Sequence, residues 1–483
     1  MTLRELLKTA LGLDWTGADP LVSSVVQDHR RSQPGSLFVA RAGAKHDGRN
    51  LIPQAAALGA VAVLAEDSPL LADSELPVVL VPDAEAVTGP LASVLLGVPS
   101  KRMTVTGVTG TDGKTSTSYL LRHLLSGQHR TALISTAGVH DGLRELPTEG
   151  HFTTPEAPEV QGLLAAAHEA GSSHVVLESS SHALDRHRLA GVHYDLAVWT
   201  NLSEEHLDWH GTLENYLLAK RTLVERAGTA VLNIDDPHFA RFAEPARRVI
   251  SYGLTPGADW HASGIRRSPG GLEFTVEALG RSFRARLPML GDFNVHNALA
   301  AAAAATELGV DPAEAIARLA DFPGVPGRMQ LLQAEPFSVL VDFAHTPPAL
   351  VKALAAVRRV ATGRLILVIG AAGERDHRKR PALAAAAVQG ADLVVFTEED
   401  SRSEDIDGIL QELKQGAVQA GARPGQLVLQ RDRRQAIHAA LTAAEPGDLV
   451  LLAGKGVEKT LERADEILEW NETKVAEEIL AGL

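Results

Sequence analysis

Short apolar runs rich in valine, isoleucine and leucine alternate along the chain with longer stretches rich in alanine and leucine. Runs of roughly four to eight such residues are typical of buried strands, and the longer stretches have the composition of helices. Because parallel strands are joined by crossovers that are usually helical, this alternation predicts an α/β fold with mainly parallel sheets.

Three blocks of this pattern follow one another, which fits 483 residues at roughly 100–200 per domain. The segment 99–101 separates the first block from the second, and the Pro/Gly-dense segment 322–328 separates the second from the third. We therefore predict domains at 1–98, 99–327 and 328–483, with a doubly wound, Rossmann-like third domain. The expected strands are 60–64, 78–81, 103–107, 174–177, 196–199, 229–233, 339–342, 365–369, 393–397, 427–429 and 449–452, and the expected helices include 84–96, 116–125 and 297–308.

The chain carries 60 acidic and 46 basic side chains, a formal net charge of −14. Proteins that mainly bind nucleic acid or anionic membranes usually have the opposite balance, so we expect neither partner. The absence of cysteine excludes disulfides, zinc–thiolate sites, iron–sulfur clusters and cysteine nucleophiles. The sequence contains no run of about 18 uncharged apolar residues, so we expect no transmembrane helix. The amino-terminal segment does not resemble a signal peptide. We expect a cytoplasmic protein.

The segment 109–116, TGTDGKTS, follows an expected strand and precedes an expected helix. Glycines allow a tight turn that directs backbone N–H groups at phosphate oxygens, and a helix amino terminus favours anions. Lys114 can reach the β- and γ-phosphates of a nucleotide, and Thr115 can offer its hydroxyl to Mg²⁺. The spacing departs from a strict Walker A sequence, because Val108 stands where its first glycine would be. We interpret the segment as a phosphate-binding loop rather than a plain glycine-rich turn.

Further polar residues of the second block follow expected strands. Glu178 stands where ligands of α/β sheets bind, so its carboxylate could hold a hard cation; the alternative is that 178–182 caps a helix. His206 and His210 are four residues apart, but without an HExxH arrangement they favour a magnesium partner or structural histidines over zinc. Lys220 lies in an expected amphipathic helix, where a lysine is usually a solvated surface residue.

Four polar segments of the third block, 342–347, 373–381, 398–402 and 454–458, all come directly after expected strands. The carboxyl ends of parallel strands meet at one edge of a sheet, so we expect these segments to converge. Arginines mixed with carboxylates suit a zwitterionic ligand, because the guanidinium binds its carboxylate and the acids bind its ammonium group. The alternative is a rim of exposed loop charges in weak ion pairs.

Ordered motifs through the whole chain resemble the Mur ligases, the ATP-dependent amide-bond-forming enzymes of peptidoglycan synthesis. They are QDHR at 27–30, the loop TGTDGKTS, TTPE at 153–156, ESSSHAL at 178–184, TNLSEEHLDWHG at 200–211, YLLAK at 216–220, GDFNVHN at 291–297 and GRM at 327–329. The resemblance is strongest to the members that add the third amino acid. It implies a three-domain architecture with a P-loop-type central ATPase domain.

The resemblance also implies roles for individual residues. ATP would be bound by Gly110, Thr111, Asp112, Gly113, Lys114, Thr115, Ser116, Asn294, Asn297, Arg328 and Asp342. Mg²⁺ would be held by Thr115, Glu178, His206 and a carbamylated Lys220, and Lys114, Glu178, His206 and Lys220 would be catalytic. UDP-MurNAc-L-Ala-D-Glu would contact Asp28, Arg30, His46, Thr153, Thr154, Ser180, Arg186 and Arg188. A free diamino acid would contact Arg375, Asp400, Arg402, Gly454 and Glu458.

The implied reaction phosphorylates the γ-carboxylate of D-glutamate, and the amine of the diamino acid then displaces phosphate. Relatives that add meso-diaminopimelate have asparagine where this chain has Asp400, so an added anion favours L-lysine or L-ornithine, with meso-diaminopimelate next. We expect a monomer. The alternatives are a ligase like folylpolyglutamate synthase and a nucleotide-binding protein without catalytic activity.

Overall fold

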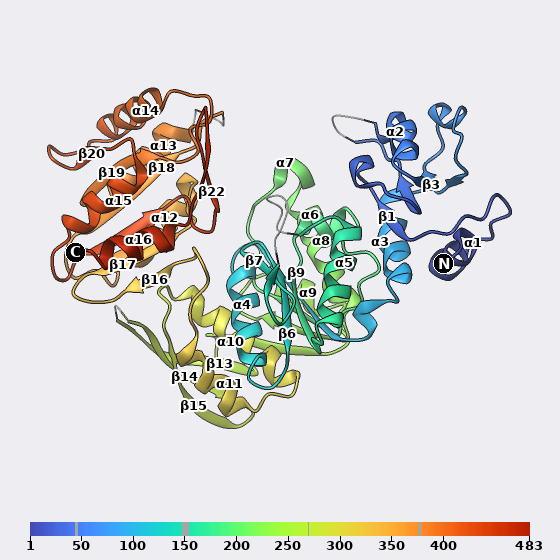
Figure 1. Cartoon of the computed structure of the whole chain (residues 1–483). Coiled ribbons are helices and arrows are strands. Elements are labelled where there is room, and N and C mark those ends of the chain that lie inside the picture. Colours follow the sequence, from blue (N-terminus) through green and yellow to red (C-terminus); the bar gives the residue numbers. More distant parts are fainter. Residues whose placement is uncertain (44–46, 147–153, 269, 375–376, 378) are drawn as a thin grey trace. The chain divides into compact units, whose positions relative to one another are not determined.

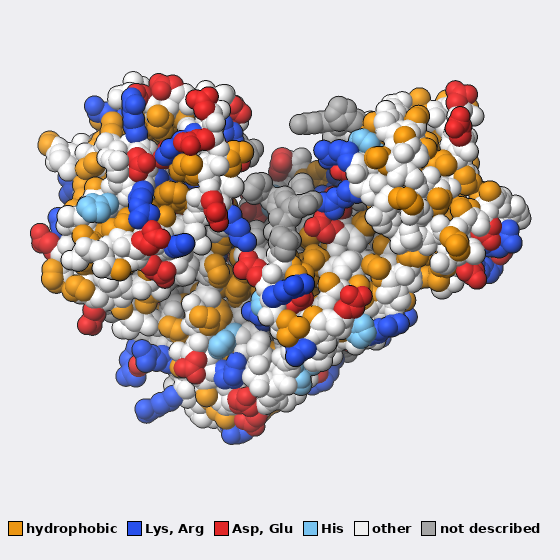
Figure 2. All heavy atoms as spheres, viewed as in Figure 1, with side chains coloured by type: hydrophobic (Ala, Val, Ile, Leu, Met, Phe, Trp, Pro, Cys, Tyr) orange, Lys and Arg blue, Asp and Glu red, His pale blue; other side chains and the backbone are white. Residues whose placement is uncertain are grey.

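The computed structural model describes residues 1–43, 47–146, 154–268, 270–374, 377 and 379–483 (Figure 1). The chain forms two compact units, Met1–Trp260 with Ala300–Asp311 and His261–Leu299 with Pro312–Leu483. None of the helices in the described part of the chain combines the length and the apolar character needed to cross a membrane. Acidic and basic side chains are mixed over the face in view in Figure 2.

A four-stranded parallel sheet in the order β1-β2-β3-β4 begins the first unit. Leu3, Leu6 and Leu7 are spaced by three and one residues, so they share one face of the first helix, and they pack in a core with Leu37 and Leu64 of the sheet. The elements are α1 (Leu3–Leu11), β1 (Ser24–Val26), β2 (Ser36–Val39), α2 (Ile52–Ala57), β3 (Ala60–Ala65), β4 (Val78–Leu80) and α3 (Ala84–Leu95).

The second sheet of this unit has the strand order β12-β11-β10-β5-β9-β6-β7-β8, parallel from β12 to β6 and antiparallel beyond. Its strands are β5 (Thr104–Thr109), β6 (Thr131–Ser135), β7 (Gly138–His140), β8 (Glu145–Leu146), β9 (His174–Glu178), β10 (Leu196–Trp199), β11 (Thr229–Asn233) and β12 (Val249–Gly253). Its helices are α4 (Lys114–Leu125), α5 (Ala157–Glu169), α6 (Ser181–Asp185), α7 (Leu207–His210), α8 (Leu213–Arg226) and α9 (Phe239–Ala243). Val108 pairs with Glu178 and Thr109 with Trp199, so β5, β9 and β10 end side by side.

The second unit contains a six-stranded sheet in the order β16-β17-β21-β18-β19-β20. Its strands are β16 (Gln330–Gln333), β17 (Ser338–Asp342), β18 (Leu365–Ala371), β19 (Leu393–Glu398), β20 (Leu427–Leu429) and β21 (Leu449–Ala453). Leu350 of α12 (Pro347–Arg358), Leu383 of α13 (Lys379–Gly390) and Leu413 of α14 (Ile406–Gln419) belong to one core, while Ile437 of α15 (Arg433–Thr442) and Ala476 of α16 (Glu472–Leu480) belong to another. This arrangement, with helices on both faces of the sheet, confirms the doubly wound prediction (Figure 1).

The remaining elements are α11 (Pro312–Arg318), the pair β22 (Thr460–Glu462) and β23 (Ile467–Glu469), and three successive strands, β13 (Trp260–Ser268), β14 (Gly271–Ala278) and β15 (Arg281–Leu287). Helix α10 (Phe293–Glu307) runs from the second unit into the first. We did not predict β6 to β8 or β13 to β15 from the sequence. In β14 and β15 buried residues alternate with exposed ones, so charged side chains interrupt the apolar run that marks a fully buried strand.

Candidate active site

The phosphate-binding loop leaves the end of β5 and turns into α4. Gly110 has φ +147, and a Cβ on it would lie 1.8 Å from Thr200 Oγ1, so this position requires glycine. Gly113, with φ +84, is the N-cap of α4, and the helix therefore begins at Lys114, two residues earlier than predicted. The amide of Asp112 donates to Asn201 Oδ1 (2.9 Å). The loop is thus fixed against the end of β10.

Lys114 lies over this loop. Its Nζ donates to the carbonyls of Thr111 (2.7 Å) and Gly110 (3.1 Å). The Lys114 cation and the amino terminus of α4 stand together here, which is the arrangement that binds phosphate. The predicted role of Lys114 is consistent with its position.

Glu178 is buried at the end of β9, with 1% of its surface exposed. Its carboxylate accepts hydrogen bonds from Thr115 Oγ1 (3.0 and 3.1 Å) and from the amide (3.0 Å) and hydroxyl (3.2 Å) of Thr136. The capping role falls to Ser180, whose Oγ accepts from the Ala183 amide at the start of α6. Glu178 and Thr115 therefore offer adjacent oxygen donors, which suit a hard divalent cation. Thr136 was not singled out from the sequence.

Lys220 is 1% exposed, so the interpretation of a solvated lysine is wrong. Its Nζ donates to the carbonyl of Gly110 (2.6 Å) and lies 4.3 Å from the ring centroid of Tyr216. Burial, together with the positive charge of Lys114, holds the pKa of Lys220 well below its usual range. The ammonium form of Lys220 is therefore disfavoured in its position behind the phosphate-binding loop.

His206 is the N-cap of α7 and adopts a left-handed conformation, with φ +56. Its ring lies 4.6 Å from that of His182 and 6.3 Å from that of Tyr216. His210 instead places Nε2 3.1 Å from Ser181 Oγ. Among the described residues, no group of three or more histidines, aspartates or glutamates could hold a metal ion.

Three of the residues expected to bind the muramyl peptide, Thr154, Ser180 and Arg188, cluster beside Glu178. Thr154 Oγ1 donates to the Glu178 carbonyl (2.9 Å) and accepts from the Ser180 amide (3.3 Å). Arg188 donates to the Thr154 carbonyl (3.2 Å) and pairs with Glu156 (2.8 Å). Two other candidates, His46 and Thr153, lie outside the described residues.

Arg186 pairs with Glu85 of α3, and Arg41 pairs with the same carboxylate. Desolvation of Glu85 is outweighed by these two guanidinium groups, which lower its pKa. Glu85 and Arg41 were not identified from the sequence.

Two further candidates for the muramyl-peptide site, Asp28 and Arg30, bind each other (2.6 Å), and this hydrogen bonding lowers the pKa of Asp28.

In the second unit, Asp342 ends β17 and accepts from the amides of Met329 (2.8 Å) and Ala344 (2.9 Å). Burial raises its pKa. The guanidinium of Arg328 stacks at 4.8 Å on the ring of Phe343, so Arg328 and Asp342 lie close together.

The buried pair Asn294 and Asn297 lies at the start of α10, where Asn297 Nδ2 donates to Asn294 Oδ1 (2.8 Å). Asn294 also donates to the Leu290 carbonyl (2.8 Å). Their amides are thus held by this part of the second unit.

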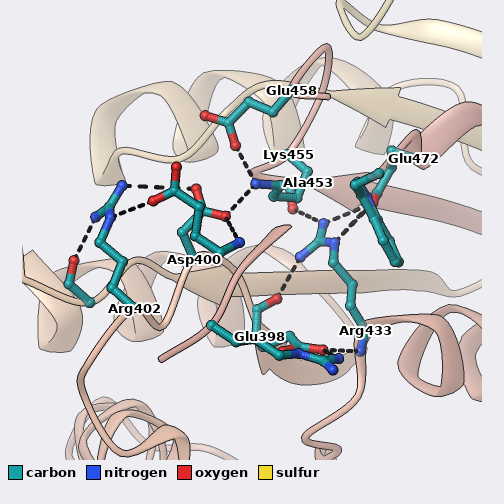
Figure 3. Close-up of polar contacts among 12 residues, drawn as sticks. Glu398, Asp400, Arg402, Arg433, Ala453, Lys455, Glu458 and Glu472 are labelled. Atoms are coloured by element: carbon teal, nitrogen blue, oxygen red, sulfur yellow. Dashed lines mark hydrogen bonds and ion pairs between the residues drawn. The ribbon is translucent and has the colours of Figure 1, made fainter. Parts of the chain in front are cut away.

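The candidate amino-acid site gathers around Lys455 (Figure 3). Lys455 is fully buried, and its Nζ lies 2.7 Å from Asp400 Oδ1 and 2.6 Å from Glu458 Oε2. Arg402 Nε donates to Glu462 Oε2 (2.9 Å). Asp400 and Lys455 are buried, so the interpretation of exposed loop charges is wrong for them. Arg375 lies outside the described residues.

Gly454 precedes Lys455 in this site. It has φ +105, and a Cβ on it would lie 3.0 Å from Glu399 Oε2, so a side chain here would crowd the carboxylate. Burial raises the pKa of Glu399. The sequence places Lys455 after an expected strand. Its ion pairs with Asp400 and Glu458 are known only from the structure.

The phosphate-binding loop at the strand ends of an α/β sheet, and the charged cluster in a doubly wound unit, define a nucleotide-binding α/β enzyme. Residues 22–93 match the catalytic domain of the Mur ligase family, residues 108–305 the Mur ligase middle domain and residues 327–456 the glutamate ligase domain. The chain belongs to the Mur ligase family and is a ligase. The three-domain architecture is confirmed, while the boundaries near 98 and 327 remain a prediction.

Relatives match over almost the whole length. The chain is 50% identical to a UDP-N-acetylmuramyl-tripeptide synthetase of Deinococcus radiodurans, over 98% of this chain and 99% of the relative. It is 39% identical to a UDP-N-acetylmuramoyl-L-alanyl-D-glutamate–2,6-diaminopimelate ligase of Gloeobacter violaceus, over 95% and 94%. A solved structure of a ligase with the latter name has a TM-score of 0.73 at 31% identity, covering 100% of this chain and 99% of the other.

Proposed function

We propose that this enzyme uses ATP to join a diamino acid to UDP-MurNAc-L-Ala-D-Glu, adding the third residue of the peptidoglycan peptide. The observation that carries the proposal is the buried set formed by Thr115, Glu178 and Lys220 around the phosphate-binding loop. The end-to-end similarity to a UDP-N-acetylmuramyl-tripeptide synthetase and to a UDP-N-acetylmuramoyl-L-alanyl-D-glutamate–2,6-diaminopimelate ligase supports the choice of substrates.

Lys114 and the amides at the start of α4 would bind and orient the terminal phosphates of ATP. The substrate carboxylate attacks the γ-phosphorus, the bond to the bridging oxygen breaks, and ADP leaves. The amine then attacks the acyl phosphate, and phosphate is expelled as the amide forms and the amine loses its proton. The ammonium of Lys114 would stabilise the charge on the transferring phosphoryl group.

The residues present fit Mg²⁺, because Thr115 and Glu178 supply adjacent oxygen donors in a buried position. Thr115, Glu178, His206 and carbamylated Lys220 would hold the ion, which when bound neutralises phosphate charge. Carbamylation needs an unprotonated amine, and burial lowers the pKa of Lys220 and so favours that form. The carbamate would convert a neutral group into a carboxylate-like ligand.

For the diamino acid we propose L-lysine or L-ornithine ahead of meso-diaminopimelate. Among the described residues of this site, the acidic groups of Asp400, Glu458 and Glu462 pair with the basic groups of Lys455 and Arg402. The argument rests on Asp400, because an anion there, where relatives that add meso-diaminopimelate have asparagine, favours a distal ammonium group over a distal carboxylate.

We also propose that the enzyme acts as a monomer in the cytoplasm, where UDP-linked substrates and ATP are available.

The test of the function is ADP release and tripeptide formation with UDP-MurNAc-L-Ala-D-Glu and each of the three amino acids. Turnover with at least one of them supports the proposal. Activity only with a folate and glutamate, or no ADP release with any substrate, would contradict it.

A further inference from the structure

A fully buried ion pair lies beneath the candidate amino-acid site. Arg433 and Glu472 are both 0% exposed, and Arg433 reaches Glu472 Oε1 through Nη2 (2.6 Å) and Oε2 through Nε (2.9 Å). Trp470 Nε1 also donates to Glu472 Oε2 (2.8 Å). Burial alone would lower the pKa of the Arg433 guanidinium. The negative charge of Glu472 and its hydrogen bonds to Arg433 outweigh this effect, so the pKa is raised. The arginine is therefore a fixed cation at the start of α15.

The other contacts of this guanidinium are made to two strand ends (Figure 3). Arg433 Nη1 donates to the carbonyl of Glu398 (3.1 Å), the last residue of β19. Nη2 donates to the carbonyl of Ala453 (2.8 Å), the last residue of β21. These strands are not neighbours, because β18 lies between them. One side chain thus links two strands that share no backbone hydrogen bonds.

Both strands continue directly into the loops of the candidate site. The residue pair Asp400 and Arg402 follows β19, and the pair Gly454 and Glu458 follows β21. On the side of the site the two loops are joined by Lys455, bound to Asp400. Below them, Arg433 joins the residues from which the loops depart.

We propose that Arg433, held by Glu472, is a positioning residue for the amino-acid site and fixes the ends of β19 and β21 relative to each other. This inference rests on the proposed function, because it requires that the two loops bind the diamino acid. A planar guanidinium has five N–H donors in a fixed arrangement, so it can donate to a carboxylate and to two carbonyls at once. A lysine ammonium is a compact charge and does not have this arrangement of donors. Misplacement of binding groups by about 1 Å can lower a rate by about 100-fold.

The test compares Arg433→Lys with the control change Arg364→Lys, at an arginine whose side chain is 43% exposed. Arg364 also pairs with a carboxylate, Asp448 (2.7 Å), and donates to a backbone carbonyl, that of Ala443 (2.7 Å). It precedes β18, at the amino-terminal end of the parallel strands of the same sheet, opposite the site. Arg433→Met with Glu472→Leu is the second variant, because replacing both partners of a buried ion pair by apolar side chains is often tolerated.

We expect both Arg433 variants to raise KM for the diamino acid by about tenfold or more, with KM for UDP-MurNAc-L-Ala-D-Glu within about twofold of wild type. Arg364→Lys should leave both constants unchanged, whatever its effect on Tm. The proposal is overturned if a folded Arg433 variant keeps the wild-type KM for the amino acid, or if Arg364→Lys raises it equally. It is also overturned if both Arg433 variants fail to fold, because the pair would then serve the fold as a whole. A wild-type enzyme inactive with every diamino acid would instead contradict the proposed function.

Discussion

Replacing Lys114 by alanine tests the phosphate-binding loop directly. In the structure the lysine ammonium makes two hydrogen bonds to loop carbonyls, Thr111 at 2.7 Å and Gly110 at 3.1 Å. Each has a net value of about 1 kcal/mol, so Lys114→Ala should cost only about 1–3 kcal/mol of folding stability. Loss of one preorganised group that stabilises transition-state charge costs about 3–4 kcal/mol, which corresponds to a decrease in kcat of about 100- to 1000-fold.

The assay is steady-state ADP release, with Tm measured on the same preparations. Lys101→Ala is the control, because Lys101 is exposed and precedes the opposite end of β5. KM for UDP-MurNAc-L-Ala-D-Glu should remain within about threefold in Lys114→Ala, because the lysine is assigned to the nucleotide. A folded Lys114→Ala enzyme with kcat within about tenfold of wild type, a loss of only ~1.4 kcal/mol, would refute the assignment.

Three further changes have expected outcomes. Lys220→Ala should reduce ADP release to a trace, and a short carboxylic acid such as acetate should restore part of it; an unmodified ammonium at Lys220 in a high-resolution map of an active nucleotide complex would exclude the carbamate. Asp400→Asn removes one anion beside Lys455 and should shift competitive turnover towards meso-diaminopimelate; an unchanged product ratio would show that Asp400 does not select the substrate. Gly110→Ala places a Cβ on Thr200 and should abolish nucleotide binding measured by calorimetry; wild-type affinity would contradict the need for glycine.

The sequence predicts the scaffold well where the signal is local. Runs of Val and Ile predicted most of the parallel strands, with bounds within one or two residues of those in the structure. The order of strand, loop and helix predicted that Lys114 and Glu178 lie at one edge of the sheet. Lys220 could not be placed from its helix, because its burial depends on the carbonyl of Gly110, which is 110 residues away in the chain. Only the family resemblance indicated its role.

The same limit explains the residues that were missed. Thr136 holds Glu178 across 42 residues, and Arg433 holds Glu472 across 39. Neither Thr136 nor Arg433 lies in a motif that indicates a chemical role. From the sequence alone, an arginine at the start of a helix is predicted to be exposed, because the carboxylate beside it in the fold is distant in the sequence. Glu85, which was also missed, is separated by 101 residues in the chain from its partner Arg186, which was predicted.

Lys220 and Lys455 are both buried, and their different surroundings decide what each group can do. Lys455 lies between the carboxylates of Asp400 and Glu458, so its ammonium is compensated and can act as a structural link. Lys220 is equally buried but donates to a neutral carbonyl, and the charge of Lys114 works against its own. Burial of Lys220 therefore favours the neutral, nucleophilic amine, and its reaction with CO₂ would create the anion that the phosphate-binding loop lacks at that position. If carbamylation is detected with labelled bicarbonate, the label should be lost in Lys220→Ala and retained in Lys455→Ala.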